Sequence, residues 1–283
     1  MTLSAQSPTT VFIAAISSDI GQSMARICRA RGWKVIGTYR DAAPLGALAA
    51  DDGISLIRCD VTDAGQIDAV ARELSQRNAV WDIFISAIGQ LAPIGPFFAS
   101  DREEWLRSLA LNGGGQLALL PSLHPFRRAR PFARVAFLVG GAINRAFANY
   151  SAYSLGKLGL VKFCELIHGE CPDIHAVAVG TGWVATKIHR QTIAAADRAG
   201  DNLARTEEFL AKGETGTSMA DIMACLDWCF AQDRDTTGGR NFSVVHDPWR
   251  DGGAALAQSL RRDDNKFKLR RHANTMTAPI VGA

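Results

Sequence analysis

The sequence lacks several features that would assign it to a narrow class of protein. Its six cysteines form no Cys-X-X-Cys pair and no histidine cluster accompanies them, so we expect reduced core thiols and no bound metal. The excess of basic over acidic residues is only +3 in 283 residues. So small an excess gives no electrostatic reason to expect a nucleic-acid partner.

Long apolar runs, a secretion signal and internal repeats are also missing. The most apolar stretch, 80–98, is interrupted by Asp82, Gln90, Pro93 and Pro96 and is too broken to span a bilayer. The first ten residues have neither a basic start nor an apolar run, so no signal peptide is expected. With 47% hydrophobic and 21% charged residues, the composition predicts an ordinary soluble, cytoplasmic protein without membrane contact.

Short β-branched runs alternate with helical stretches along most of the chain. Strands are predicted over 11–16, 34–38, 54–59, 83–86, 134–139, 176–179 and 241–245, and helices over 21–31, 63–77, 105–120 and 150–167. The glycines at 113–115 are expected to loosen the third of these helices. The alternation predicts a single-domain α/β fold over 1–283, a doubly wound parallel sheet of the Rossmann type with about seven strands. In such a sheet, ligands bind beyond the carboxyl ends of the strands.

Two regions depart from this alternation. The connection at 187–220 is long and polar, which is typical of a lid over a binding site. Residues 250–283 form a C-terminal tail with six basic side chains near Asp263 and Asp264. A solvated tail, a partner-docked tail and a phosphate-binding arm are all open interpretations of it.

The turn after the first strand, AAISSDIGQSMAR, resembles the TGxxxGxG loop of the short-chain dehydrogenase/reductase family. Ala14, Ala15 and Asp19 replace the threonine and the first two glycines. Amides that precede a helix can cradle a diphosphate at its positive end. The resemblance assigns diphosphate contacts to Ser17, Ser18, Ile20 and Gly21.

Two of these replacements fit a diphosphate-binding turn only under a structural condition. Ala15 adds only a methyl group and tolerates a tight turn if its φ is negative. The Asp19 carboxylate would repel a phosphate, so it must point away or cap the helix.

Residues at the ends of the second and third strands are candidates for binding the adenosine end of a dinucleotide. Tyr39 stands where NAD-preferring members of the family carry an acidic residue, and Arg40 stands where NADP-preferring members place a basic one. A guanidinium there can hold a 2′-phosphate bidentately, which favours NADP and leaves NAD as an alternative. In the string CDVTD, the resemblance implies that Asp60 accepts from the adenine amino group and that Val61 borders the ring.

The ends of the fourth and sixth strands extend the resemblance. ISAIG stands for the family's NNAG, and GTGWVATK resembles its PGxVxT segment, with Thr181 in place of the proline. Small residues are needed where the backbone passes a cofactor. The resemblance implies dinucleotide contacts at Ser86, Ala87, Gly89, Gly182, Val184 and Thr186, the last two holding the nicotinamide carboxamide.

The motif Tyr153-Ser-Leu-Gly-Lys157 carries the catalytic prediction. A spacing of four places both side chains on one helix face. A free phenol has a pKa near 10, and a nearby ammonium lowers it. The resemblance makes Tyr153 the acid–base, with Lys157 lowering its pKa and Asn112 holding a water that links Lys157 to solvent. A packed tyrosine, a solvated lysine and a locally satisfied asparagine are the structural alternatives.

One departure concerns the substrate oxygen. The family's catalytic serine lies thirteen residues before the tyrosine, where this chain has Gly140. Losing one such donor costs about 10²–10³ in rate. Asn144, a main-chain amide or a water could replace it, or the glycine could admit a bulky substrate. Further candidates for substrate contact are Gln90, Trp183, His189, His246 and Trp249.

Together these residues predict an NADP-dependent oxidoreductase that transfers a hydride between nicotinamide and a carbonyl or secondary alcohol of a small-molecule substrate. One alternative is a dinucleotide-binding sensor or scaffold with little or no dehydrogenase activity. An epimerase or dehydratase is another, although the chain is short for the larger epimerase branch. The resemblance also implies a homodimer or homotetramer.

Overall fold

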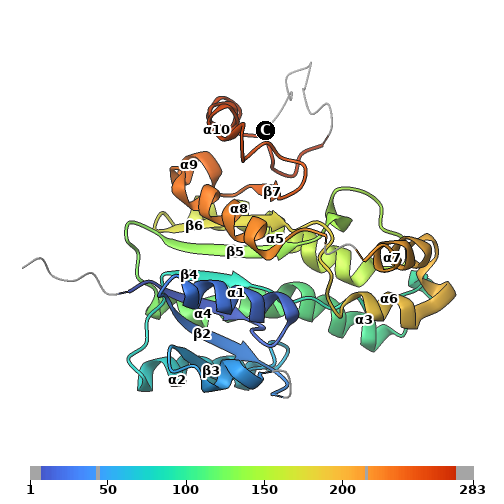
Figure 1. Ribbon diagram of the computed structural model, residues 1–283, viewed down its shortest axis with the longest axis horizontal. Helices are drawn as coiled ribbons and strands as arrows, with labels where there is room; N and C mark the ends of the chain where they lie inside the picture. The colour runs from blue at the N-terminus through green and yellow to red at the C-terminus, as the bar shows by residue number, and fades with distance from the viewer. Residues whose placement is uncertain (1–7, 43–44, 214–215, 272–283) are drawn as a thin grey trace, which may run out of the picture.

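Seven parallel strands form one sheet in the computed structural model, which describes residues 8–42, 45–213 and 216–271. The strand order is β3-β2-β1-β4-β5-β6-β7 (Figure 1). The bounds are β1 (Thr10–Ala14), β2 (Lys34–Tyr39), β3 (Ile54–Arg58), β4 (Ile83–Ser86), β5 (Ala133–Val139), β6 (Ile174–Gly180) and β7 (Asn241–Ser243). This order confirms the predicted doubly wound Rossmann fold. The order reverses between β1 and β4, where such sheets open a crevice at their carboxyl edge.

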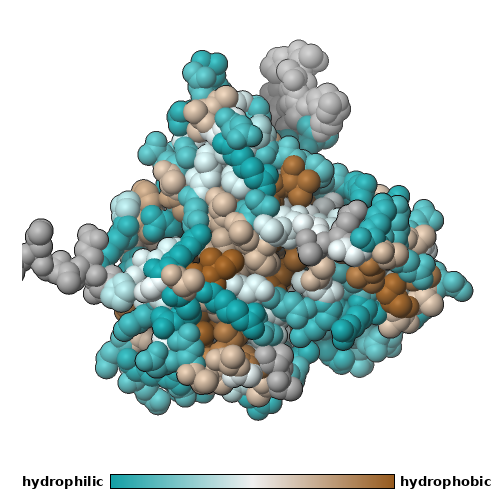
Figure 2. Space-filling view, viewed as in Figure 1, coloured by the Kyte–Doolittle hydropathy of each residue, from teal (hydrophilic) through white to brown (hydrophobic). Residues whose placement is uncertain are grey.

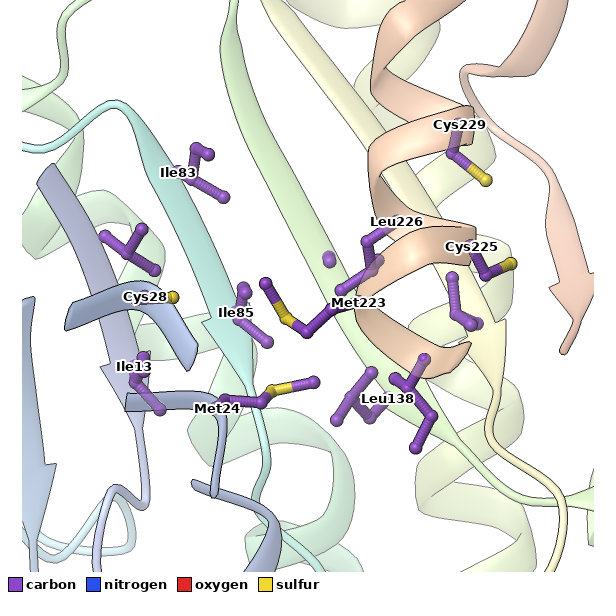
Figure 3. Close-up of a cluster of buried hydrophobic side chains, with 14 of the residues drawn as sticks. Ile13, Met24, Cys28, Ile83, Ile85, Leu138, Met223, Cys225, Leu226 and Cys229 are labelled. Carbon is purple, nitrogen blue, oxygen red and sulfur yellow. The ribbon is translucent and has the colours of Figure 1, made fainter. Parts of the chain in front are cut away.

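Helices cover both faces of the sheet. One face carries α1 (Asp19–Ala30), α8 (Met219–Ala231) and α10 (Gly253–Arg262), and the other carries α2 (Ala64–Gln76), α4 (Gly115–Leu123) and α5 (Ser151–Glu170). Successive strand residues serve the two cores in turn, with Ile13 in the first and Phe12 in the second. In the first core, Met24 of α1 and Met223 of α8 lie beside Ile85 (Figure 3).

The remaining helices surround the carboxyl edge and the end of the sheet. They are α3 (Arg102–Leu109), α6 (His189–Ala195), α7 (Asp201–Ala211) and α9 (Arg234–Thr237). A π-helical turn, Ala110–Gly114, separates α3 from α4 and confirms the expected loosening. The turn lies against α5, since a Cβ on Gly113 would be 3.1 Å from the main chain of Gly156. Glycines on both elements therefore allow α5 to approach the carboxyl edge closely.

The predicted lid connection contains α6 and α7, which project at one end of the molecule, on the right in Figure 1. Its residues 214–215 lie outside the described part of the chain. Figure 2 shows hydrophobic surface over these helices, where Ile193 and Leu210 are exposed. Among the described residues, no helix is long and apolar enough to cross a bilayer.

The segment after β7 packs on its own chain. Leu256 and Leu260 of α10 are buried, and the amide of Asn241 in β7 donates to the carbonyl of Phe267 at 2.9 Å. Arg240, only 1% exposed, donates to the carbonyls of Leu260 and Asp263. These contacts cover β7, the last strand of the sheet, whose backbone would otherwise present unpaired hydrogen-bonding groups at the edge. Residues 272–283 of the expected tail lie outside the described residues.

Gly21→Ala tests how closely α1 packs on the turn that precedes it. The added Cβ would lie 2.3 Å from the carbonyl oxygen of Ala15, so α1 has to shift. We expect the free energy of unfolding to fall by about 1–3 kcal/mol in urea denaturation. Gly159→Ala in α5, where nothing lies within 4 Å, is the matched control and should gain about 0.5–1 kcal/mol. A gain for both variants would contradict the close packing.

Candidate functional site

The turn between β1 and α1 forms one wall of the crevice. Ser18 caps α1, because its hydroxyl oxygen accepts from the amide of Gly21 at 3.0 Å. The amides of Ser17, Asp19 and Ile20 have no hydrogen-bond partner within the described ranges. Unpaired amides at the positive end of a helix are suited to an anion such as a diphosphate.

Ala15 does not have the negative φ that would let an alanine tolerate this tight turn. Its φ is 61°, in the left-handed region, rather than negative. This conformation costs an alanine about 1–2 kcal/mol. It persists because the amide and the hydroxyl of Ser18 both donate to the Ala15 carbonyl, at 3.0 and 2.8 Å.

Asp19 does not cap α1, a role that Ser18 fills. Its carboxylate reaches across to the segment after β6, where Oδ2 accepts from the amide of Lys187 at 2.6 Å. Oδ1 lies 3.9 Å from Nζ of the same lysine. No feature of the sequence pairs these two residues.

The expected adenosine end is a pocket of about 180 Å³, lined by Arg40, Asp60, Gln90 and Arg107 among others. Arg40 is exposed and pairs with the neighbouring Asp41, at 3.2 Å. The Asp60 carboxylate accepts from the amide and the hydroxyl of Thr62 at 2.9 and 2.7 Å. Arg107 of α3 was not singled out in the sequence, because one exposed arginine on a helix carries no signal.

Lys157 is buried in the core of the site, so it is not the solvated lysine of the structural alternative. Its Nζ donates to the carbonyl of Ile88 at 2.6 Å and to that of Leu138 at 2.8 Å. Burial lowers the pKa of Lys157 to about 7. The amine therefore faces the main chain at the ends of two strands.

Tyr153, one turn before Lys157 on α5, is partly exposed. Burial raises the pKa of Tyr153 to about 12, and no neighbouring cation lowers it. The lysine amine donates to the carbonyls of Ile88 and Leu138 in this structure. The expectation that Lys157 lowers the pKa of Tyr153 stays a prediction.

Gly140 lies directly under the phenol. A Cβ on Gly140 would be 2.7 Å from the Tyr153 hydroxyl oxygen, a contact that real Cβ atoms do not make. The hydroxyl thus needs the space that a side chain on residue 140 would take. Asn144, one of the possible substitute donors, is exposed, and its side chain makes no hydrogen bond within the described residues.

Asn112 lies in the π-helical turn and is fully buried. Its Nδ2 donates to the carbonyls of Gln90 and Ser108 at 2.8 and 3.0 Å, and its Oδ1 accepts from the amide of Gln90 at 3.0 Å. These bonds hold the loop after β4, and none of them reaches Lys157. The contacts are those of a locally satisfied asparagine, and the water link to Lys157 stays a prediction.

Two predicted contact residues have their side chains in the interior instead. The Ser86 hydroxyl is fully buried and donates to Gln116 of α4 at 2.6 Å, so it faces a helix. Trp249 is 5% exposed and its indole donates to the carbonyl of Val244, which makes it a core residue. The expectation that Trp249 lines a substrate pocket is therefore wrong. His246, by contrast, is exposed.

Trp183 and His189 form an aromatic stack on the lid side. Their rings lie 5.3 Å apart with an interplanar angle of 7°, and Phe209 of α7 contacts both. A ring nitrogen of His189 lies 2.9 Å from the carbonyl oxygen of Val184. His189 therefore joins the segment after β6 to the lid helices, and Trp183 keeps an exposed surface.

The segment 186–188, which we call the strap, closes on the crevice from the β6 side. The Ile188 side chain packs on the same buried cluster as Tyr153 and lies 3.7 Å from the position of a Cβ on Gly89. Beyond the strap, Oε1 of Gln191 in α6 accepts from the amides of Leu91 and Ala92 at 2.8 and 3.0 Å. The sequence missed these lid anchors, because they join residues about a hundred positions apart.

Most of the predicted site residues do meet at the carboxyl edge of the sheet. Those with backbone or side chain there are Ser17, Ser18, Ile20, Gly21, Ala87, Gly89, Gly140, Tyr153, Lys157, Gly182, Val184 and Thr186. Residue 182 has to be a glycine, since its φ is 72° and a Cβ there would lie 2.6 Å from the Val245 side chain. Val61 is buried against Gly115 of α4.

Comparison with known proteins gives one family. A family model described as enoyl-(acyl carrier protein) reductase matches residues 14–226. A benzil reductase ((S)-benzoin forming) of Saccharomyces cerevisiae is 26% identical over 55% of this chain, and the match covers 63% of that enzyme. Momilactone A synthase of Oryza sativa is 26% identical over 86% of this chain and 88% of its own. The chain thus spans less than two thirds of the yeast relative.

Solved structures share the fold. A short-chain dehydrogenase/reductase from Saccharomyces cerevisiae superposes with a TM-score of 0.76 at 19% identity, covering 88% of this chain and 98% of the other. A short-chain dehydrogenase of Shigella flexneri in complex with NADP has a TM-score of 0.68 at 16% identity, covering 83% and 96%. At these identities the likeness concerns the arrangement of the chain.

Gly140→Ala tests whether the phenol excludes a side chain at residue 140. We expect a loss of about 1–3 kcal/mol in the free energy of unfolding, because the Cβ collides with the Tyr153 oxygen. In a Tyr153→Phe background the nearest remaining ring atom is Cζ at 3.7 Å, an ordinary contact, so the same change should cost less. A double-mutant cycle in urea should give a coupling of about 0.5 kcal/mol or more. Equal costs in both backgrounds would refute the steric role of the hydroxyl.

Proposed function

The chain belongs to the short-chain dehydrogenase/reductase family and is an oxidoreductase of that type, and from this premise we propose that it uses NADP(H) to interconvert a carbonyl and a secondary alcohol. The observation that carries the proposal is the placement of Tyr153 and Lys157. Both lie on α5 beside Gly140 and the loop after β4, at the switch point of the sheet. The yeast relative is named for forming (S)-benzoin from benzil, which supports a carbonyl substrate.

The framework of the crevice fits a dinucleotide. Gly21 leaves α1 close to the first turn, where a Cβ would meet the Ala15 carbonyl at 2.3 Å, and the unpaired amides of α1 suit a diphosphate. The 180 Å³ pocket with Arg40 and Asp60 suits the adenosine end. Asp19 is the exception, because its carboxylate stands at the same helix terminus.

Tyr153 acts as the proton donor in this proposal. When bound, the nicotinamide supplies or accepts the hydride. With a pKa of about 12, the Tyr153 phenol is protonated at neutral pH and holds the proton that a new alkoxide takes up. In this proposal the phenol gives its proton to the alkoxide in reduction and takes it back in the reverse reaction.

Arg40, Lys157 and Thr186 contribute binding. The exposed Arg40 guanidinium is free to turn from Asp41 to a 2′-phosphate, and the resemblance assigns ribose hydroxyls to Lys157 and the carboxamide to Thr186. The Thr186 side chain makes no hydrogen bond with any described residue. Gly140 leaves the phenol as the nearest donor to a substrate oxygen.

A dinucleotide-binding protein with little turnover is the second candidate. The observation in its favour is that residue 140 offers no hydroxyl and that Asn144 does not replace it at the phenol. In this alternative NADPH binds, while Tyr153 contributes to no measurable reduction.

We also propose that the protein forms a homodimer or homotetramer and that it is located in the cytoplasm. Leu155 and Leu166 of α5 are each about half exposed and offer apolar surface for a second copy. The cytoplasmic location stays a prediction from the sequence.

Tyr153→Phe tests the proposed reaction. Consumption of NADPH against a panel of ketones and aldehydes that includes benzil should fall by about 10²–10⁴ relative to the unmodified enzyme, because the phenol is the proton donor. Binding of NADPH, followed by fluorescence, should change little. If NADPH binds and no carbonyl compound is reduced above the Tyr153→Phe level, the reductase proposal fails and the binding protein is favoured.

Arg40→Ala tests the choice of cofactor. Loss of a charge-assisted contact to the 2′-phosphate should weaken NADPH binding by about tenfold or more, and NADH binding much less. Arg107→Ala is the matched control, since it removes an equal charge from the same pocket and should affect both cofactors alike. Equal weakening of NADPH and NADH by Arg40→Ala would exclude the 2′-phosphate assignment.

A further inference from the structure

The carboxylate of Asp19 bridges the two walls of the crevice. Asp19 is the first residue of α1, and its partner Lys187 follows β6 on the other side of the switch point. The hydrogen bond from the Lys187 amide is 2.6 Å long, and Lys187 Nζ adds a charge of opposite sign at 3.9 Å. A charged acceptor makes this a stronger contact than a neutral hydrogen bond.

Contacts on the far side of the strap hold it in the same closed position. Ile188 packs in a small cluster with Tyr153 and the buried residues Leu91 and Tyr150. The Tyr150 hydroxyl donates to Thr192 of α6 at 3.0 Å, a bond that is itself buried. The strap is therefore anchored at Asp19 on one side of the crevice and at α6 on the other.

This closed strap conflicts with the ligand that the crevice is built to take. A diphosphate binds at the amides of a helix N-terminus, where the backbone must approach it closely. Here Asp19 is the first residue of that helix, and the negative charge of its carboxylate, held by the Lys187 amide, opposes a second anion near the terminus. Ile188 lies beside Gly89, in the loop after β4 that the resemblance assigns to the dinucleotide, and packs on the same buried cluster as Tyr153.

We propose that Asp19 and Lys187 form a latch that closes the strap over the crevice, and that Asp19 thereby sets the affinity for the dinucleotide diphosphate. The inference rests on the proposed function for the identity of the ligand. Binding requires the carboxylate to release the Lys187 amide and the strap to move away from Gly89. Asp19 thus determines binding affinity and takes no part in the chemistry.

Hydrogen exchange tests the latch without any ligand. In Asp19→Asn and Asp19→Gly, a peptide that contains the Lys187 amide should exchange about tenfold faster than in the unmodified protein. Trypsin cleavage after Lys187 should accelerate in parallel. Glu103→Gln is the matched control, because Glu103 is an exposed acid in the first turn of α3 without a contact in the described chain. Unchanged exchange in both Asp19 variants overturns the latch.

Direct binding of NADPH and NADH tests the effect on affinity. We expect Asp19→Asn and Asp19→Gly to lower the Kd for both dinucleotides by about tenfold, and Glu103→Gln to leave it unchanged. An unchanged or higher Kd in the Asp19 variants overturns the role in affinity, even where exchange is faster. If no variant binds either dinucleotide, the proposed function fails together with the role in affinity, whereas faster exchange still supports the closed strap.

Discussion

The buried amine of Lys157 connects three parts of the fold that local structure leaves independent. Its backbone belongs to α5, and its two acceptors are the carbonyls of Ile88 after β4 and Leu138 in β5. An amine tolerates burial when its donors are satisfied, so these bonds hold α5 at one height above the sheet. Tyr153, one turn earlier, is thereby placed at the crevice. The close contact of Gly113 with α5 brings the π-helical turn, and the loop it holds, to the same edge.

The absence of a side chain at Gly140 is a condition of this arrangement. A Cβ there would lie 2.7 Å from the phenol oxygen of Tyr153, so the phenol would have to shift to admit a side chain. Its enclosure also raises the pKa, so the group is an acid rather than a base at neutral pH. A site that has lost the usual hydroxyl donor therefore keeps one donor in its protonated form.

Closure of the crevice depends on contacts between residues far apart in the chain. The strap after β6 meets the start of α1 through Asp19, and α6 meets the loop after β4 through Gln191. The stack of Trp183 on His189 joins the segment after β6 to the lid helices. In the proposed function one edge of the sheet carries the chemistry, and in the proposed latch a separately anchored segment controls access to it. Such a division is common where a scaffold holds the reacting groups and a loop admits the ligand.

The sequence by itself determined the features that short-range patterns encode. Alternating strand and helix periods specified the doubly wound sheet, the glycines near Asn112 indicated the loosened helix, and a spacing of four placed Tyr153 and Lys157 on one face. Only the tertiary structure decided the left-handed turn at Ala15 and the pairing of Asp19 with Lys187. Hydrogen bonds from the nearby Ser18 hold the Ala15 turn, but the periodicity of apolar residues carries no information on φ. The contact between Asp19 and Lys187 depends on how elements more than a hundred residues apart pack, and no local pattern specifies that packing.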